Sequence, residues 1–350
     1  MHCMALMCVV IAMGMVSEVF ADTEISGEKV RTVTIEYGYL KATFRDNSRS
    51  PKAALSGVAS LLNTKAAPDY NAYDPDGGRS AGINFEHITS GHKNPNNSFT
   101  PRNGDYALYR LPDGKSVLWR RQAEDEPWGV ESATKITMTA PNYLDIEFRC
   151  KAQDARPFGP RGYAIMFWAN YMNDVSDIPL HFLGIEKPGG EEKWIAADGP
   201  KGPKDWNQGG TYRNVEAGDL GYDEDHNSSL NNWSYDYPRY TKPFYYGLAG
   251  HGMVYMLMFD KAYTPEDEIR YSIFKFKLKQ HPRPAWDYQY VIHKVEAGKE
   301  YGYRARVVWK KFVSPEDCLK EYENWEVIAN CTLHIPDSPS ENVARSQSAI

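Results

Sequence analysis

Several patterns that mark common functional classes are missing from this sequence of 350 residues. No glycine-rich phosphate loop stands between a strand and a helix, and no CxxC pair supports a zinc site. Basic residues are outnumbered, because 40 Lys and Arg face 46 Asp and Glu and the net charge is −6. This balance argues against a surface that binds nucleic acid, but it leaves room for a local basic cleft that binds an acidic ligand.

Cysteine is scarce too, with five residues in all. Two of them lie in an apolar run at the N-terminus, which leaves Cys150, Cys318 and Cys331. Cys150 falls on the apolar phase of a predicted strand, so we expect it to be a buried free thiol. Cys318 and Cys331 are 13 residues apart, and a disulfide between them is open if the compartment is oxidising.

Long apolar runs are absent except at the N-terminus. Residues 3–16 are apolar or small, and Val19-Phe20-Ala21 gives the small-x-small ending that signal peptidase cleaves. This run of 14 residues is too short to cross a bilayer, so residues 1–21 are predicted to be a signal peptide, with a buried N-terminal helix as the alternative. No later segment approaches the roughly 18 apolar residues of a membrane span. We therefore expect a secreted or periplasmic protein that is free of the membrane after cleavage.

Helix signals are rare. The convincing one has Ser314 as N-cap, Pro315 at the first helical position and acidic residues in the first turn. Most of the preceding chain shows period-two alternation, as in 143–151 and 301–309, or short continuous apolar runs. Strands that follow one another without crossover helices exclude α/β folds. The sequence predicts an all-β protein, a large antiparallel β-sandwich with one C-terminal helix, forming a single domain over residues 22–335.

Three segments lack a regular pattern. Residues 46–80 are rich in Ala, Asn, Asp and Pro, and residues 186–240 are rich in Gly, Asn, Asp, Trp and Tyr. Long loops of this kind in a compact domain commonly carry function. The tail, residues 336–350, has the composition of a disordered segment.

Aromatic residues are abundant, with 24 Tyr, 13 Phe and 9 Trp. Their rings suit the core of a β-protein and also suit surfaces that stack against sugar rings. Size, long strands and aromatic-rich loops resemble the galactose-mutarotase-type β-super-sandwich, over roughly residues 28–312. Three segments, GINFEHI (82–88), YAIMFWANY (163–171) and PAWDYQYVI (284–292), look like those of secreted bacterial proteins associated with polysaccharide breakdown. The resemblance implies a fold shared by aldose epimerases, polysaccharide lyase domains and glycoside hydrolase domains, and no single activity.

Histidine is scarce, so the position of each one carries information. His87 and His181 lie within predicted strands, and His251 stands between two glycines before an apolar strand. Each taken alone is more often a satisfied, partly buried imidazole than a catalytic group. On a concave sheet face under the two long loops, however, all three would meet, and we take them as catalytic candidates.

The remaining candidates follow from sugar chemistry. A lyase needs Arg to neutralise a uronate carboxylate and His or Tyr to remove the adjacent proton, roles that Arg120 and Tyr246 fit by residue type. A glycosidase needs two carboxylates, for which Glu131 is the catalytic candidate and Glu86 and Asp287 are further acids. An epimerase needs only one His and one Glu. The predicted substrate-binding residues are Glu86, Arg121, Tyr171, Trp206, Trp233, Tyr245, Trp286 and Asp287.

No cofactor is predicted, and no metal site is assigned. The acidic loop around Asp223 and Asp225 offers oxygen ligands that suit Ca²⁺, but its spacing does not match an EF-hand, and a solvated acidic loop is the favoured explanation.

These patterns leave three functional classes open. We favour a secreted carbohydrate-active enzyme, a polysaccharide lyase or glycoside hydrolase whose partner is a polysaccharide or oligosaccharide. A non-catalytic carbohydrate-binding module needs the aromatic surface but no acid–base pair. A structural or interaction protein of the cell envelope needs neither.

Overall fold

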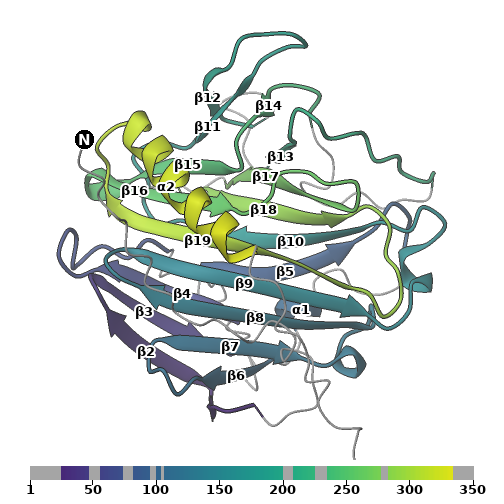
Figure 1. Cartoon of the computed structure of the whole chain (residues 1–350), viewed down its shortest axis with the longest axis horizontal. Helices are drawn as coiled ribbons and strands as arrows, with labels where there is room; N and C mark the ends of the chain where they lie inside the picture. The colour runs from purple at the N-terminus through teal and green to yellow at the C-terminus, as the bar shows by residue number, and fades with distance from the viewer. Residues whose placement is uncertain are drawn as a thin grey trace, which may run out of the picture. The chain divides into compact units, whose positions relative to one another are not determined.

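The computed structural model describes residues 25–46, 56–73, 82–94, 100–103, 106–199, 208–224, 235–276 and 283–333 (Figure 1). The predicted signal peptide (1–21), Trp206, Trp233, Asp225 and the predicted disordered tail lie outside these residues. The chain forms two compact units, Met1–Phe312 and Val313–Ile350. None of the described helices combines the length and apolar character that crossing a membrane requires.

The largest sheet contains eleven strands and is antiparallel throughout. Its order is β1-β6-β7-β8-β9-β19-β16-β15-β11-β12, with β14 paired to β11. The bounds are β1 (Glu28–Val30), β6 (Ala107–Arg110), β7 (Ser116–Arg121), β8 (Val130–Thr139), β9 (Tyr143–Ala152), β11 (Leu180–Ile185), β12 (Lys193–Ala197), β14 (Arg239–Tyr240), β15 (Phe244–Ala249), β16 (Met253–Phe259) and β19 (Glu300–Lys311).

A second sheet has five antiparallel strands in the order β13-β17-β18-β10-β5, and a third has three in the order β2-β3-β4. Figure 1 shows β6 to β9 and β19 side by side in one layer and β5, β10 and β18 in another. The bounds are β2 (Thr32–Tyr37), β3 (Leu40–Arg45), β4 (Gly57–Asn63), β5 (Ile83–Thr89), β10 (Ala164–Asn170), β13 (Gln208–Tyr212), β17 (Asp267–Lys275) and β18 (Ala285–Ile292).

An aromatic core joins the eleven-stranded and five-stranded sheets face to face. Phe148 of β9 meets Trp168 of β10 with ring centroids 5.1 Å apart, and Phe259 of β16 meets Tyr288 of β18 at 4.9 Å. The hydroxyl of Tyr288 also pairs with that of Tyr303 across the layers at 2.7 Å. Edge-to-face rings and paired hydroxyls satisfy both the apolar and the polar parts of tyrosine in the interior. The predicted all-β antiparallel sandwich is confirmed, and much of the aromatic content is core.

Both segments predicted to be long loops contain strands. Strand β4 lies within residues 46–80, and β12, β13 and β14 lie within residues 186–240. Strand β4 is a short apolar stretch that begins with a glycine and ends with an asparagine, residues typical of turns. Strand β13 contains two glycines, so it shows no alternation of apolar and polar side chains. Short helical turns connect other strands: α1 (Thr100–Asn103), η1 (Ala123–Asp125), η2 (Arg156–Phe158) and η3 (Gly250–Gly252).

The second unit contains the predicted helix, α2 (Pro315–Leu333). Its N-cap is confirmed, because the hydroxyl of Ser314 accepts a hydrogen bond from the amide of Asp317 at 3.2 Å. The disulfide left open between Cys318 and Cys331 is not formed: Cys318 is in no disulfide, and the two positions lie on one helix about 20 Å apart along its axis. Cys150 is confirmed as a buried free thiol of β9.

Candidate active site

A β-bulge in β5 places two neighbouring polar residues together. In the pairing of β10 with β5, Phe167 faces His87 and Trp168 faces Phe85, so Glu86 is the extra residue. Phe85 stacks on Trp168 inside the core, whereas His87 stacks on Phe167, on the opposite face, at 4.4 Å. Strict alternation would put Phe85 and His87 on one face of β5, and the bulge separates them.

Glu86 is the centre of a buried polar cluster. Its carboxylate accepts hydrogen bonds of 2.5 Å from the Tyr171 hydroxyl and from Nη1 of Arg102, and it lies 3.5 Å from Nδ1 of His87. Burial alone would raise the pKa of Glu86, but the hydrogen bond with His87 and the charges of His87 and Arg102 lower it below the usual range. Glu86 is therefore ionised in the folded protein.

Asp287 is the second carboxyl group of this cluster. Its neighbours Trp286 and Tyr288 point into the core, so the Asp287 side chain lies on the opposite face of β18. One oxygen accepts a 2.8 Å hydrogen bond from the amide of Asn170. Burial and the nearby charge of Glu86 raise the pKa of Asp287 well above its usual range, more than that hydrogen bond lowers it. Asp287 therefore keeps its proton to a higher pH than an exposed aspartate does.

The cluster of Glu86, His87, Arg102, Tyr171 and Asp287, called here the carboxyl cluster, unites a carboxyl group of lowered pKa with one of raised pKa. Two carboxyl groups whose surroundings drive their pKa values apart form a ready acid–base pair. Burial and the charge of Glu86 also raise the pKa of Tyr171 far above its usual value, so its phenol keeps its proton and acts as a donor. Arg102 and Tyr171 are partly exposed, and a quarter (25%) of the Arg102 side chain is exposed against 7% for Glu86.

The cluster gathers four of the predicted site residues and one that the sequence did not reveal. Arg102 comes from the short helix α1, in a stretch with no strand or loop signature to single it out. Only its proximity to Glu86 in the fold identifies it.

The three candidate histidines do not meet, so their predicted convergence is wrong. His87 lies on β5 in the five-stranded sheet, whereas His181 lies on β11 in the eleven-stranded sheet. His181 stacks on Tyr246 at 5.0 Å and lies 3.3 Å from Asp177. His251 is exposed in the turn η3, with its ring 4.7 Å from that of Tyr70. A sequence pattern gives each strand but not the sheet that it joins.

Other predicted site residues have structural partners away from the carboxyl cluster. Glu131 bridges Arg120 at 3.2 Å and Lys151 at 3.3 Å on the eleven-stranded sheet. Arg121 is 3% exposed and donates to the carbonyl oxygens of Thr100 and Asp125. Arg121 therefore anchors a turn and cannot reach a ligand without breaking it.

Tyr245 and Trp286 are core residues, so their predicted role in binding substrate is wrong. Both are fully buried, and the hydroxyl of Tyr245 donates to the Trp286 carbonyl at 2.7 Å. The Trp286 ring covers Gly247, where a Cβ atom would stand 2.4 Å from it. Tyr246, on the other face of β15, is 3% exposed and packs between His181 and Trp194.

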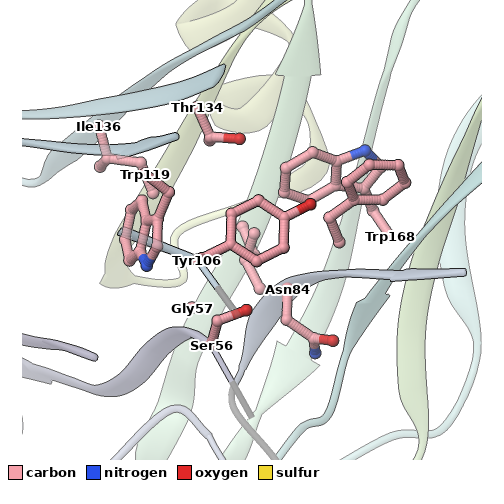
Figure 2. A pocket seen from close by; sticks show the side chains of 10 residues that line it. Ser56, Gly57, Asn84, Tyr106, Trp119, Thr134, Ile136 and Trp168 are labelled. Atoms are coloured by element: carbon pink, nitrogen blue, oxygen red, sulfur yellow. The ribbon is translucent and has the colours of Figure 1, made fainter. Parts of the chain in front are cut away.

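Two hollows lie elsewhere in the first unit. Figure 2 shows one of ≈ 20 Å³ among Tyr106, Trp119, Trp168 and Asn84, with room for about one water molecule. The other is a cleft of ≈ 590 Å³ along β1, β6 and β7, within the size range of ligand sites.

The described residues contain no group of three or more His, Cys, Asp or Glu side chains arranged to hold a metal ion. Of the two aspartates considered for Ca²⁺, Asp223 accepts a 2.6 Å hydrogen bond from Nε of Arg161, and Asp225 lies outside the described residues.

Comparisons with known proteins add a likeness of fold. No family model matches the chain, and no curated protein matches it. A putative aldose 1-epimerase from Escherichia coli K12 is 11% identical with a TM-score of 0.44, over 81% of this chain and 100% of that one. Heparan sulfate lyase HepC from Pedobacter heparinus is 9% identical with a TM-score of 0.42, over 81% of this chain and 35% of that one.

A xanthan lyase from Paenibacillus is 10% identical with a TM-score of 0.38, and the match covers 85% of this chain but 26% of that one. The chain thus spans about a third or less of either lyase. These neighbours are of the kinds that the sequence resemblance named. At such TM-scores the likeness carries no argument about activity.

Proposed function

We propose that the protein is an exported carbohydrate-active enzyme whose acid–base machinery is the carboxyl cluster. The observation that carries the proposal is the pair of buried carboxyl groups with opposite displacements of pKa, Glu86 lowered and Asp287 raised. Burying two carboxyl groups whose charges interact costs stability, and such arrangements are concentrated at active sites. A packing role alone would be met better by apolar residues.

The same assignment of roles serves both chemistries left open by the sequence. In a lyase, Glu86 takes the proton from the carbon next to the substrate carboxylate, the bond to the glycosidic oxygen breaks, and a proton from Asp287 or Tyr171 goes to the leaving oxygen. In a hydrolase, Asp287 protonates the leaving oxygen while Glu86 assists the attacking water or attacks directly. In both, the contacts of Glu86 with His87, Arg102 and Tyr171 hold its pKa low.

Elimination is favoured over hydrolysis by Arg102. This guanidinium is 2.5 Å from Glu86 and has the most exposed side chain of the ion pairs in the cluster, so it stands where an incoming carboxylate would be neutralised. A hydrolase acting on neutral sugars has no need of a cation there.

Activity on a panel of polysaccharides tests the proposal. The purified protein is incubated with uronate-containing and neutral polymers. A rise in absorbance from unsaturated ends identifies a lyase, and new reducing ends without that rise identify a hydrolase. The E86Q and D287N variants should lose turnover by roughly two to four orders of magnitude, whereas K41Q, on an exposed site of β3, should keep it. Full turnover in E86Q and D287N would overturn the assignment.

A non-catalytic sugar-binding module is the second candidate, and the ≈ 590 Å³ cleft is the observation that favours it. Binding without any product over the whole panel would support this candidate. Export is tested separately by N-terminal sequencing of the secreted protein, which should begin at Asp22.

A further inference from the structure

The large cleft is built on the face of the eleven-stranded sheet that is turned away from the core. Leu108 and Trp119 point inward, so the alternate residues Tyr109 and Arg120 point outward. Lys29 of β1 stands directly opposite Tyr109 in the antiparallel register. Side chains at such positions lie next to each other, so an ammonium group and an aromatic ring share one wall of the cleft.

The charges of the cleft favour an anionic ligand. Its charged lining consists of Lys29, Arg31 and Arg120 against Asp46 and Asp125. Arg120 is already paired with Glu131 at 3.2 Å. Lys29 and Arg31 are exposed, and neither has an acidic partner among the described residues. The protein as a whole has a net charge of −6, but these two cations, which have no acidic partner in the described part of the chain, make the cleft locally positive. An acidic ligand would complement that charge.

The other groups in the cleft suit a sugar. Tyr109 is half-buried and offers a ring face, and the exposed amide of Gln122 offers both a donor and an acceptor. An aromatic face beside a few convergent polar groups is the usual composition of a small-molecule site. Inorganic phosphate would not require the ring, and an apolar ligand would not require the cations.

A chain of contacts connects the cleft with the carboxyl cluster. Asp125 lines the cleft, and its carbonyl oxygen accepts a hydrogen bond from Arg121. Arg121 also donates to the carbonyl oxygen of Thr100 at 2.8 Å, at the start of α1. Arg102, two residues further along α1, holds Glu86. The two sites are therefore tied to the same short segment.

We propose that the cleft formed by β1, β6 and β7 binds an acidic sugar unit, a uronate, with its carboxylate at Lys29 and Arg31 and its ring against Tyr109. The inference rests on the proposed function in taking a carbohydrate as the ligand, and it narrows the substrate class to acidic saccharides.

Calorimetric titration of the full chain with three probes tests this assignment. The probes are a galacturonic acid trimer, the matching neutral galactose trimer and a sulfated galactose oligosaccharide. The galacturonate trimer should bind at least about tenfold more tightly than the neutral one, and its affinity should fall as salt is raised. The double variant K29Q/R31Q should bind it about tenfold more weakly, whereas K41Q should bind it as the wild type does. Both cations are exposed, so the double variant should melt at the wild-type temperature.

Equal affinity for the acidic and neutral trimers, or unchanged affinity in K29Q/R31Q, would overturn the inference. Preference for the sulfated probe over the uronate would also overturn it, since the site would then recognise sulfate esters. Turnover of a neutral polymer without uronate binding would leave the proposed function standing and remove this inference. Uronate binding without turnover of any polymer would support this inference and remove the proposed enzymatic function.

Discussion

Asp287 should be replaceable by asparagine with a gain in stability and a loss of activity. The Asp287 carboxyl is 2% exposed, and burial and Glu86 raise its pKa well above the usual range. Asparagine keeps the shape and keeps an oxygen to accept the hydrogen bond from Asn170. Asparagine cannot ionise. D287N therefore removes the free energy that the wild-type unfolded chain gains when Asp287 loses its proton there.

The sign and size of the effect follow from linkage. In the unfolded chain Asp loses its proton near pH 4, whereas folded Asp287 keeps it to a much higher pH. Between these two pKa values the folded state binds the proton and the unfolded state does not. The free energy of unfolding of the wild type therefore falls as pH rises. Each pKa unit corresponds to about 1.4 kcal/mol. Allowing for imperfect replacement, we expect D287N to gain about 1–2 kcal/mol at neutral pH, a rise in Tm of roughly 2–4 °C.

Urea unfolding of the wild type and D287N at pH 4, 6 and 8 measures this gain. The difference in the free energy of unfolding should be near zero at pH 4 and should grow towards pH 8. A variant that is less stable than the wild type at every pH, or a difference that does not change with pH, would refute the argument that Asp287 is held protonated against its own preference.

Three further predictions follow from the same contacts. E86Q should change the free energy of unfolding in the opposite direction. Because the pKa of Glu86 is lowered, its ionised form stabilises the fold above the unfolded pKa near 4.3, and this stabilisation is lost as pH falls through the folded pKa; E86Q should therefore lose about 2 kcal/mol at neutral pH and less in acid. Urea unfolding at two pH values measures the loss, and a larger loss in acid would contradict the argument. G247A should lose about 1–3 kcal/mol, since its Cβ would stand 2.4 Å from the Trp286 ring, whereas G218A, with open space around it, should be nearly neutral; equal melting temperatures for the two variants would show that the ring yields. Burial raises the pKa of the Cys150 thiol and shields it, so a thiol reagent should modify it only on unfolding; rapid modification of the native protein would show that β9 opens locally.

The fold class was predictable because alternation and turn residues are local signals. The strand at residues 143–152 alternates without a break, and the helix that begins at Pro315 has a complete capping signature. The strands β12, β13 and β14 were missed because they are short. In addition, β13 contains two glycines and pairs with the distant β17, and β14 has two residues and pairs with the distant β11. Local sequence does not report such pairing.

The candidate site was predictable in its residue types and not in its assembly. Glu86, His87, Tyr171 and Asp287 were all singled out from polar positions in or beside apolar strands. The bulge that turns His87 away from Phe85 depends on the register between β10 and β5, and Arg102 enters from a separate segment. Which sheet His181 joins depends on the order of strands along the sheet. These are long-range relations, and one sequence contains no direct trace of them.

The most direct test of the account is the protonation state of the two carboxyl groups in the native protein. Carbon-13 labelling of Asp and Glu, with the E86Q and D287N variants to assign the signals, allows both to be titrated by NMR. We predict that at neutral pH the Asp287 carboxyl carbon has the chemical shift of a protonated acid and the Glu86 carbon that of a carboxylate. Two ionised carboxylates at neutral pH would contradict the proposed acid–base pair.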